Sequence, residues 1–378
     1  MNPILKYIKD ILRKKRVVGN DQQLTGLVKA DMLLQELVDM KKVPGISVTV
    51  MRNGEKLLQK GYGYANIENG IPMDPGETIC RIASISKNIA AIALAHMVKD
   101  GMISLDASFY KYVPYFPKKQ WDFTIRQLAS HTAGIRGYRG LEYGLNKPYS
   151  IQESIAIFKD DDLLFEPGTD YLYTSFDWVL ISLAMQEASG IPFEEYTREK
   201  VLRPLDMTKT LAPSRKREGE EETLHLEDRN PGTSRSNTVF QTRATYYTKN
   251  RFGFRKAIPV NNHYKLAGGG FLSTSGDIAK FGQAVLDEKA LDKEHLDEFL
   301  TSETVKQNKT YYGLGWQVSE DKHGRPYYGH VGNGVGGYSN LFVYPREQMV
   351  FAALINCTNP GIQDELNMVQ DRLLKIEG

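Results

Sequence analysis

Residues 81–87 read Arg-Ile-Ala-Ser-Ile-Ser-Lys, which places Ser84 and Lys87 three residues apart where an apolar run with helical spacing begins. At that spacing two side chains share one face of a helix. A lysine that has lost its proton can accept the serine hydroxyl proton and so convert a weak nucleophile into a strong one. Because free N–H groups at a helix N-terminus favour negative charge, this turn predicts a nucleophile, its base and an oxyanion donor.

The Ser-x-x-Lys pattern occurs twice more, at 108–111 and 319–322, so the pattern alone does not identify a site. The first copy lies in a segment dense in Tyr, Phe and Pro, and the second is flanked by charge, as in a surface turn. Only Ser84 leads into a long helical pattern, with apolar residues at 85, 89, 92, 93 and 97. Taken by itself, Ser84 is also explained as a helix N-cap, so the rest of the chain must decide.

The composition is that of an ordinary globular protein. A chain of 378 residues, 41% hydrophobic and 25% charged, can bury a large core in one domain or two lobes. The formal net charge of +2 is too near zero to predict a nucleic-acid partner. No apolar run approaches the roughly 18 residues of a transmembrane helix.

No metal or organic cofactor is expected. The two cysteines, Cys80 and Cys357, have no histidine or second cysteine close in sequence and are predicted to be buried thiols. The chain contains no H-E-x-x-H motif, no paired C-x-x-C motif and no phosphate-binding glycine loop.

Residues 1–16 interleave isoleucines with lysines, which is typical of a basic amphipathic helix and not of a secretory signal. A solvated terminal helix that packs by one face is favoured, and peripheral contact with a membrane surface is the alternative. We expect a soluble protein, and the compartment of its precursor stays open.

Strand patterns occur at both ends of the chain and helical patterns between them. An Asn53-Gly54 turn predicts a β-hairpin over 43–66. Further strands are predicted at 312–318, 338–344 and 349–356, helices at 151–158, 178–189 and 362–374, and a loop-to-helix transition over 266–284.

This order predicts an α+β fold: an antiparallel sheet from both chain ends, flanked by helices, with an inserted mainly helical lobe. Residues 1–83 would form the N-terminal helix and hairpin of the α/β lobe, and 84–212 the mainly helical lobe with the nucleophile helix. Residues 213–237 are charged and almost devoid of large apolar side chains, as in a mobile insertion. Residues 238–378 would return to the α/β lobe.

Two more segments carry chemistry. The first is Tyr-Leu-Tyr-Thr-Ser-Phe at 171–176, where a tyrosine beside a lysine could relay a proton. The second is His-Val-Gly-Asn-Gly at 330–334, interpreted as the opening of a terminal strand. A glycine there lets a substrate approach the backbone closely, and an exposed N–H could complete an oxyanion hole.

In this order and spacing the three segments resemble the serine β-lactamase and penicillin-binding-protein superfamily. The resemblance is to its class C and D-alanyl-D-alanine carboxypeptidase-like branch, peptidase family S12, and within it to the mitochondrial serine β-lactamase-like group and its bacterial relatives. The segments that carry it are 81–87, 128–135, 165–176, 266–274 and 330–337. The β-lactamase/transpeptidase-like fold is what the resemblance implies.

The resemblance also implies residue roles. Ser84 would be the acylated nucleophile, Lys87 its proton acceptor, and Tyr173 a partner in the acid–base work. The backbone N–H groups of Ser84 and Asn333 would form the oxyanion hole. Substrate-binding positions would be Ser175, His330 and Gly332, with His330 standing where many relatives have a lysine.

The departure from the family pattern is Ser175, where relatives usually have asparagine. A serine is shorter and lacks the amide's paired donor and acceptor, so peptide or ester hydrolysis is favoured over efficient β-lactamase activity. The expected partner is a small-molecule or peptide substrate. Two alternatives stay open, a penicillin-recognising sensor that acylates once and an assembly-forming scaffold, and homo-oligomerisation stays open with them.

Overall fold

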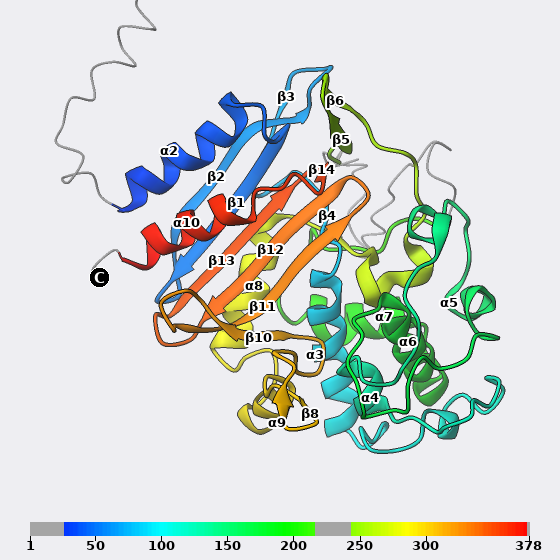
Figure 1. The fold of residues 1–378 in the computed structure, drawn as a ribbon. Coiled ribbons are helices and arrows are strands. Elements are labelled where there is room, and N and C mark those ends of the chain that lie inside the picture. Colours follow the sequence, from blue (N-terminus) through cyan, green and yellow to red (C-terminus); the bar gives the residue numbers. More distant parts are fainter. Residues whose placement is uncertain (1–25, 216–242, 376–378) are drawn as a thin grey trace, which may run out of the picture.

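A seven-stranded antiparallel sheet, built from both ends of the chain, is the centre of the fold (Figure 1). The computed structural model describes residues 26–215 and 243–375. The strand order is β10-β11-β12-β13-β1-β2-β3. In chain order these strands are β1 Gly45–Arg52, β2 Glu55–Asn66, β3 Ile71–Pro72, β10 Gln317–Glu320, β11 Pro326–Gly334, β12 Gly337–Tyr344 and β13 Met349–Ile355. The fold therefore confirms the predicted sheet, in which early and late segments pair directly.

The first two strands form the predicted hairpin. Asn53 and Gly54, between β1 and β2, have φ angles of 51° and 78°. Positive φ at both central residues matches the twist of the flanking strands, and Asn-Gly adopts it readily.

Strand β13 is buried along its whole length because both faces of the sheet are covered. Its alternate residues belong to two separate hydrophobic clusters: Ala352 to one, Phe351 to the other. Helix α8 (Ser275–Leu286) packs on the first face. Helices α2 (Gly26–Asp39) and α10 (Gln363–Leu374) lie side by side over the second (Figure 1).

The helical part of the chain shares its core with the α8 face of the sheet, since both belong to one continuous cluster. Its principal helix, α3 (Ile85–Lys99), is buried over nearly all its length. The other elements are η1 Phe109–Lys111, α4 Ile125–Ala129, η2 Gly140–Gly144, α5 Ile151–Ser154, η3 Ile155–Ile157, α6 Ser175–Ser189, α7 Phe193–Thr197 and η4 Arg198–Leu202.

Two very short strands join the start of α3 to a segment far along the chain. Strand β4 (Cys80–Arg81) pairs antiparallel with β7 (Leu272–Ser273). The Phe271 N–H donates to the Ser86 hydroxyl at 3.1 Å, which gives the middle serine of the motif a structural role. The turns η5 (His263–Lys265) and η6 (Leu266–Gly270) precede β7; η6 is thereby brought against α3, and η5 packs against α5 and α6.

The remaining elements lie at the edges of the fold. They are β5 Tyr247–Asn250, β6 Gly253–Lys256, α9 Lys293–Phe299, β8 Thr304–Val305, β9 Asn308–Lys309 and β14 Cys357–Thr358. No helix within 26–215 or 243–375 is both long and apolar enough to cross a bilayer.

Three boundaries differ from the sequence predictions. The strand predicted at 312–318 begins only at Gln317, because the chain turns through Gly315 with φ of 85°. Residues 330–334 end β11 instead of opening it. The helix predicted over 151–158 is one α turn followed by a 3-10 turn.

The other predicted elements are present, with α6 starting at Ser175, three residues earlier than expected. Cys80 and Cys357 are buried free thiols. The predicted amphipathic helix at 1–16 and most of the insertion at 213–237 lie outside the described residues.

Candidate active site

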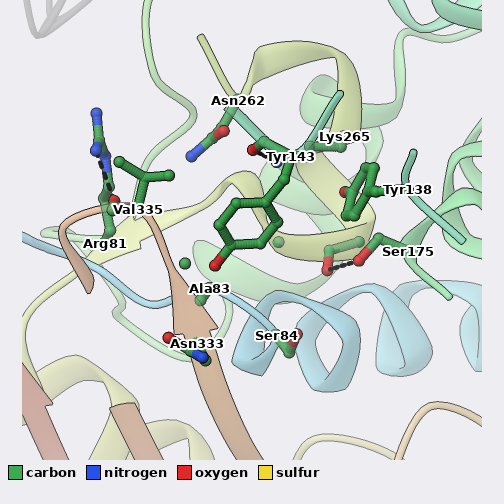
Figure 2. Close-up of a pocket in the computed structure, with 13 residues that line it drawn as sticks. Arg81, Ala83, Ser84, Tyr138, Tyr143, Ser175, Asn262, Lys265, Asn333 and Val335 are labelled. Atoms are coloured by element: carbon green, nitrogen blue, oxygen red, sulfur yellow. Dashed lines mark hydrogen bonds between the residues drawn. The ribbon is translucent and has the colours of Figure 1, made fainter. Parts of the chain in front are cut away.

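Ser84 is the N-cap residue of α3 and lies at the meeting point of three segments (Figure 2). Lys87, one turn along α3, places Nζ 3.2 Å from Ser84 Oγ. Tyr173, just before α6, donates its hydroxyl proton to the same Oγ at 2.7 Å. The serine hydroxyl therefore has a lysine and a tyrosine within hydrogen-bond reach.

The two other Ser-x-x-Lys copies have structural roles. Ser108 caps η1, accepting from the Tyr110 N–H, and donates to Asp122 at 2.7 Å. Ser319 lies within β10. Among the described residues, Ser84 and Lys87 are the only serine and lysine of this pattern whose side chains are joined by a hydrogen bond.

Lys87 is fully buried and is held by three oxygens. Besides Ser84 it contacts Ser175 Oγ at 3.3 Å and the Gly268 carbonyl. Burial, reinforced by the nearby cation of Lys265, lowers the pKa of Lys87 to about 7. At neutral pH about half of these lysines are then uncharged, and an uncharged amine can accept the Ser84 proton across the same contact.

The pKa of Tyr173 is shifted in the opposite direction to that of Lys87. The residue as a whole is 37% exposed, whereas its hydroxyl donates a hydrogen bond to Ser84 inside the site. Burial raises the pKa of the Tyr173 phenol well above its usual value, and the hydrogen bond to Ser84 offsets this only partly. The phenol thus keeps its proton, so Lys87 is the candidate base and Tyr173 the candidate acid.

The backbone before the nucleophile is strained. Ala83 has a φ of 44°, a region that alanine rarely adopts. This conformation turns the chain from β4 into α3 and presents Ser84 at the pocket (Figure 2).

Strand β11 approaches this turn very closely. A Cβ at Gly332 would lie 2.2 Å from Ser339 Oγ, 2.5 Å from the Ile82 carbonyl oxygen and 3.1 Å from Ser84 N. Gly332 is buried and lets the backbone of β11 pack closely against this turn, while its substrate contact stays a prediction. The next residue, Asn333, lines the pocket with Ser84 (Figure 2).

His330, two residues earlier on β11, is buried as well. It is 1% exposed; its Nδ1 lies 2.7 Å from the Val331 carbonyl and its Nε2 3.0 Å from the Tyr312 hydroxyl. Both nitrogens are engaged inside the protein and the ring packs against Tyr173, so the substrate-binding role of His330 stays a prediction. Burial and the nearby Lys87 lower its pKa to about 3, so the ring is neutral at physiological pH.

A second buried histidine supports the same tyrosine. The His131 ring centroid lies 4.5 Å from that of Tyr173, and His131 Nδ1 lies 2.7 Å from Asp177 Oδ2. Both side chains of this pair are buried. Burial lowers the pKa of His131 and raises that of Asp177, which favours neutral partners sharing one hydrogen bond.

The pocket beside Ser84 is cationic and aromatic. Its wall includes Ser175, together with residues to which the sequence assigned no function: Arg81, Tyr138, Tyr143, Asn262 and Lys265 (Figure 2). Lys265 precedes the Gly268–Gly270 run, in which Gly268 packs against Ser175. Within the described residues no three His, Cys, Asp or Glu side chains cluster as metal ligands would.

Comparison with known proteins agrees with this geometry. Residues 30–374 match the beta-lactamase family, and the chain belongs to it. The mitochondrial serine beta-lactamase-like protein LACTB of Homo sapiens is 30% identical over 83% of this chain and 71% of its own length.

Solved structures share the fold. An octameric penicillin-binding protein homologue from Pyrococcus abyssi has a TM-score of 0.75 at 26% identity, over 92% of this chain and 77% of that one. The D-amino acid amidase of Ochrobactrum anthropi SV3, complexed with L-phenylalanine amide, has a TM-score of 0.72 at 22% identity, over 92% and 98% of the two chains. The resemblance predicted from the sequence is therefore confirmed, and the fold is β-lactamase/transpeptidase-like.

Proposed function

We propose that this member of the beta-lactamase family is a serine hydrolase that forms an acyl-enzyme on Ser84. The observation that carries the proposal is the placement of Ser84 Oγ within hydrogen-bond distance of both Lys87 Nζ (3.2 Å) and Tyr173 Oη (2.7 Å). Those are the positions needed for removal of the nucleophile's proton and its return to a leaving group.

In the acylation step, neutral Lys87 accepts the hydroxyl proton as Ser84 Oγ bonds to the carbonyl carbon of an amide or ester. The N–H groups of Ser84 and Asn333 would stabilise the oxyanion, a contribution of about 3 kcal/mol per donor in other oxyanion holes. The intermediate collapses as the leaving group takes the Tyr173 proton. The Lys87 ammonium, whose Nζ lies 4.7 Å from the Tyr173 ring centroid, then returns a proton to the Tyr173 oxygen and becomes a neutral amine again.

Deacylation repeats these steps with water as the nucleophile. Water loses a proton to the Lys87–Tyr173 pair, attacks the ester carbonyl, and Ser84 leaves with a proton returned to it. Each cycle consumes one water and restores every side chain. This chemistry requires no metal and no organic cofactor.

Peptide or ester substrates fit the pocket better than β-lactams. Ser175 places only a hydroxyl 3.3 Å from Lys87 where an asparagine amide would reach further toward a substrate amide. An amidase and the hydrolase EstCE1, described as having promiscuous acyltransferase activity, are among the structural neighbours, and they support this ranking.

Intact-mass spectrometry tests the proposal. Wild type, Ser84→Ala and Ser319→Ala would each be exposed to a fluorophosphonate and to a penicillin, with p-nitrophenyl acetate turnover measured in parallel. We expect one fluorophosphonate adduct and turnover in wild type and Ser319→Ala, and neither in Ser84→Ala. Equal labelling of Ser84→Ala, or no label on wild type, would reject the catalytic proposal and leave the scaffold as the better explanation.

A penicillin adduct that persists for hours would instead identify a sensor.

We also propose homo-oligomerisation, because the Pyrococcus abyssi neighbour is octameric. Light scattering on the eluting protein tests this, and a monomeric mass at micromolar concentration would contradict it.

A further inference from the structure

Lys265 is a buried cation of the pocket whose charge the proposed reaction does not use. It ends η5, directly before the η6 turn, and its side chain is 8% exposed while lining the same pocket as Ser84 and Ser175 (Figure 2). Burying an ammonium group costs free energy unless a counter-charge or the face of an aromatic ring stabilises it.

The compensation is provided by aromatic rings. Lys265 Nζ lies 5.0 Å from the ring centroid of Tyr138, 5.6 Å from that of Tyr143 and 5.7 Å from that of Tyr264. Its hydrogen bond is a long one, 3.5 Å to the Tyr143 carbonyl. Within 26–215 and 243–375 no carboxylate forms an ion pair with it.

The charged residues of the pocket wall are all positive among those described. Among the described residues that line it, Arg81 and Lys265 are cationic and none is Asp or Glu. Burial and the charge of Arg81 lower the pKa of Lys265 to about 7, and an anion bound beside it would raise that pKa again. The part of the pocket around Lys265 is therefore arranged to accept negative charge.

The position of the leaving group determines which part of the substrate lies beside Lys265. Tyr173, the proton donor to the leaving group, is not part of this pocket wall, so the leaving group departs toward Tyr173. The acyl part of the substrate then occupies the pocket that holds Ser175 and Lys265.

We propose that Lys265 makes the enzyme select substrates whose acyl group carries a carboxylate, through an ion pair formed inside the Tyr138–Tyr143–Tyr264 cage. The proposal rests on the proposed function, since it concerns the acyl subsite of Ser84. It names a specificity residue that contacts substrate without taking part in proton transfer.

Matched substrates that differ only in charge test this inference. N-acetyl-aspartyl and N-acetyl-asparaginyl p-nitroanilides, each as D and L forms, are nearly equal in size. For the preferred enantiomer we expect wild-type kcat/KM to favour the aspartyl substrate by about 10- to 100-fold, as for a hydrogen bond to a charged group.

Variants at position 265 locate the effect. Lys265→Met should bring the aspartyl-to-asparaginyl ratio close to one, Lys265→Arg should retain most of it, and the surface control Lys293→Met should leave it unchanged. The ratio is informative because any change that Lys265→Met causes in the Lys87 base acts on both substrates alike. An unchanged ratio in Lys265→Met, or equal turnover of both substrates by wild type, would overturn the inference.

A binding measurement on wild type covers the case in which Lys265→Met does not fold or the anilides are not cleaved. We expect 3-carboxyphenylboronic acid to inhibit at least tenfold more strongly than its carboxamide, and equal inhibition would overturn the inference. Loss of p-nitrophenyl acetate turnover in Ser84→Ala separates the two proposals. If that variant stays active, the proposed function fails; if it is inactive and no charge preference exists, only the Lys265 inference fails.

Discussion

The pH dependence of acylation is the sharpest consequence of burying Lys87. Its pKa of about 7 compares with 10.5 for an ordinary lysine. At pH 7 roughly half of the molecules then carry a neutral amine, against about 0.03% for an ordinary lysine, a difference of roughly a thousandfold in available base. The buried contacts to Ser175 Oγ and the Gly268 carbonyl hold this amine against Ser84 in either state.

The protonation state of Lys87 determines how the acylation rate changes with pH. Below its pKa, Lys87 is protonated and cannot accept the Ser84 proton, so acylation should be slow at pH 5, rise through a midpoint near 7 and level off by pH 9. The rate of fluorophosphonate adduct formation, followed by intact mass between pH 5 and 10, measures this with no contribution from deacylation.

Two controls make the profile decisive. Ser84→Ala reports background labelling at each pH, and Lys265→Met should move the midpoint upward because the Lys265 cation contributes to the lowered pKa of Lys87. Since the two lysines interact, the midpoint belongs to the pair. A rate that keeps rising to pH 10 without a plateau would refute the reasoning that Lys87 is the base.

Three substitutions extend the argument. Tyr173→Phe removes the proton donor and should lower kcat/KM for a p-nitrophenyl ester by about 10²- to 10⁴-fold, whereas Tyr171→Phe on the same segment should stay within threefold; similar losses in both would indicate a packing role. Gly332→Ala introduces a Cβ 3.1 Å from Ser84 N, and should cost about 1–3 kcal/mol in urea unfolding and about 10²-fold in kcat through a displaced oxyanion donor; near-wild-type values for both would contradict the close approach. Ser175→Asn restores an amide in the pocket and should raise the rate of penicillin acylation about tenfold, the value of one added hydrogen bond; an unchanged rate, seen by intact mass, would separate β-lactam recognition from this position.

Local signals in the sequence predicted much of the framework. The Asn53-Gly54 turn, the alternating strand β1 and the continuous apolar run that becomes β13 are each recognisable from their own residues alone. The Ser84–Lys87 spacing likewise needs only one helical turn to bring its two side chains together. Each of these depends on neighbours within about a dozen residues.

What the sequence did not reveal depends on contacts between distant segments. Lys265 reaches the Ser84 pocket because β7 pairs with β4, and no periodicity around residue 265 signals that pairing. His330 was expected to face substrate, but whether a strand residue points into a pocket or into the core depends on the register of β11 against β12. The presence of one histidine in the motif does not determine that register.

The pairing of Ile46 with Ile355 across β1 and β13 has a consequence for how the protein is made. Until residues 349–355 leave the ribosome, the N-terminal hairpin has an open strand edge, and open edges favour wrong pairings and aggregation. Contacts that span some three hundred residues also form slowly. The nascent chain therefore carries an unprotected edge until β13 has been made, and this exposure follows from the topology of the sheet and not from the chemistry of the site.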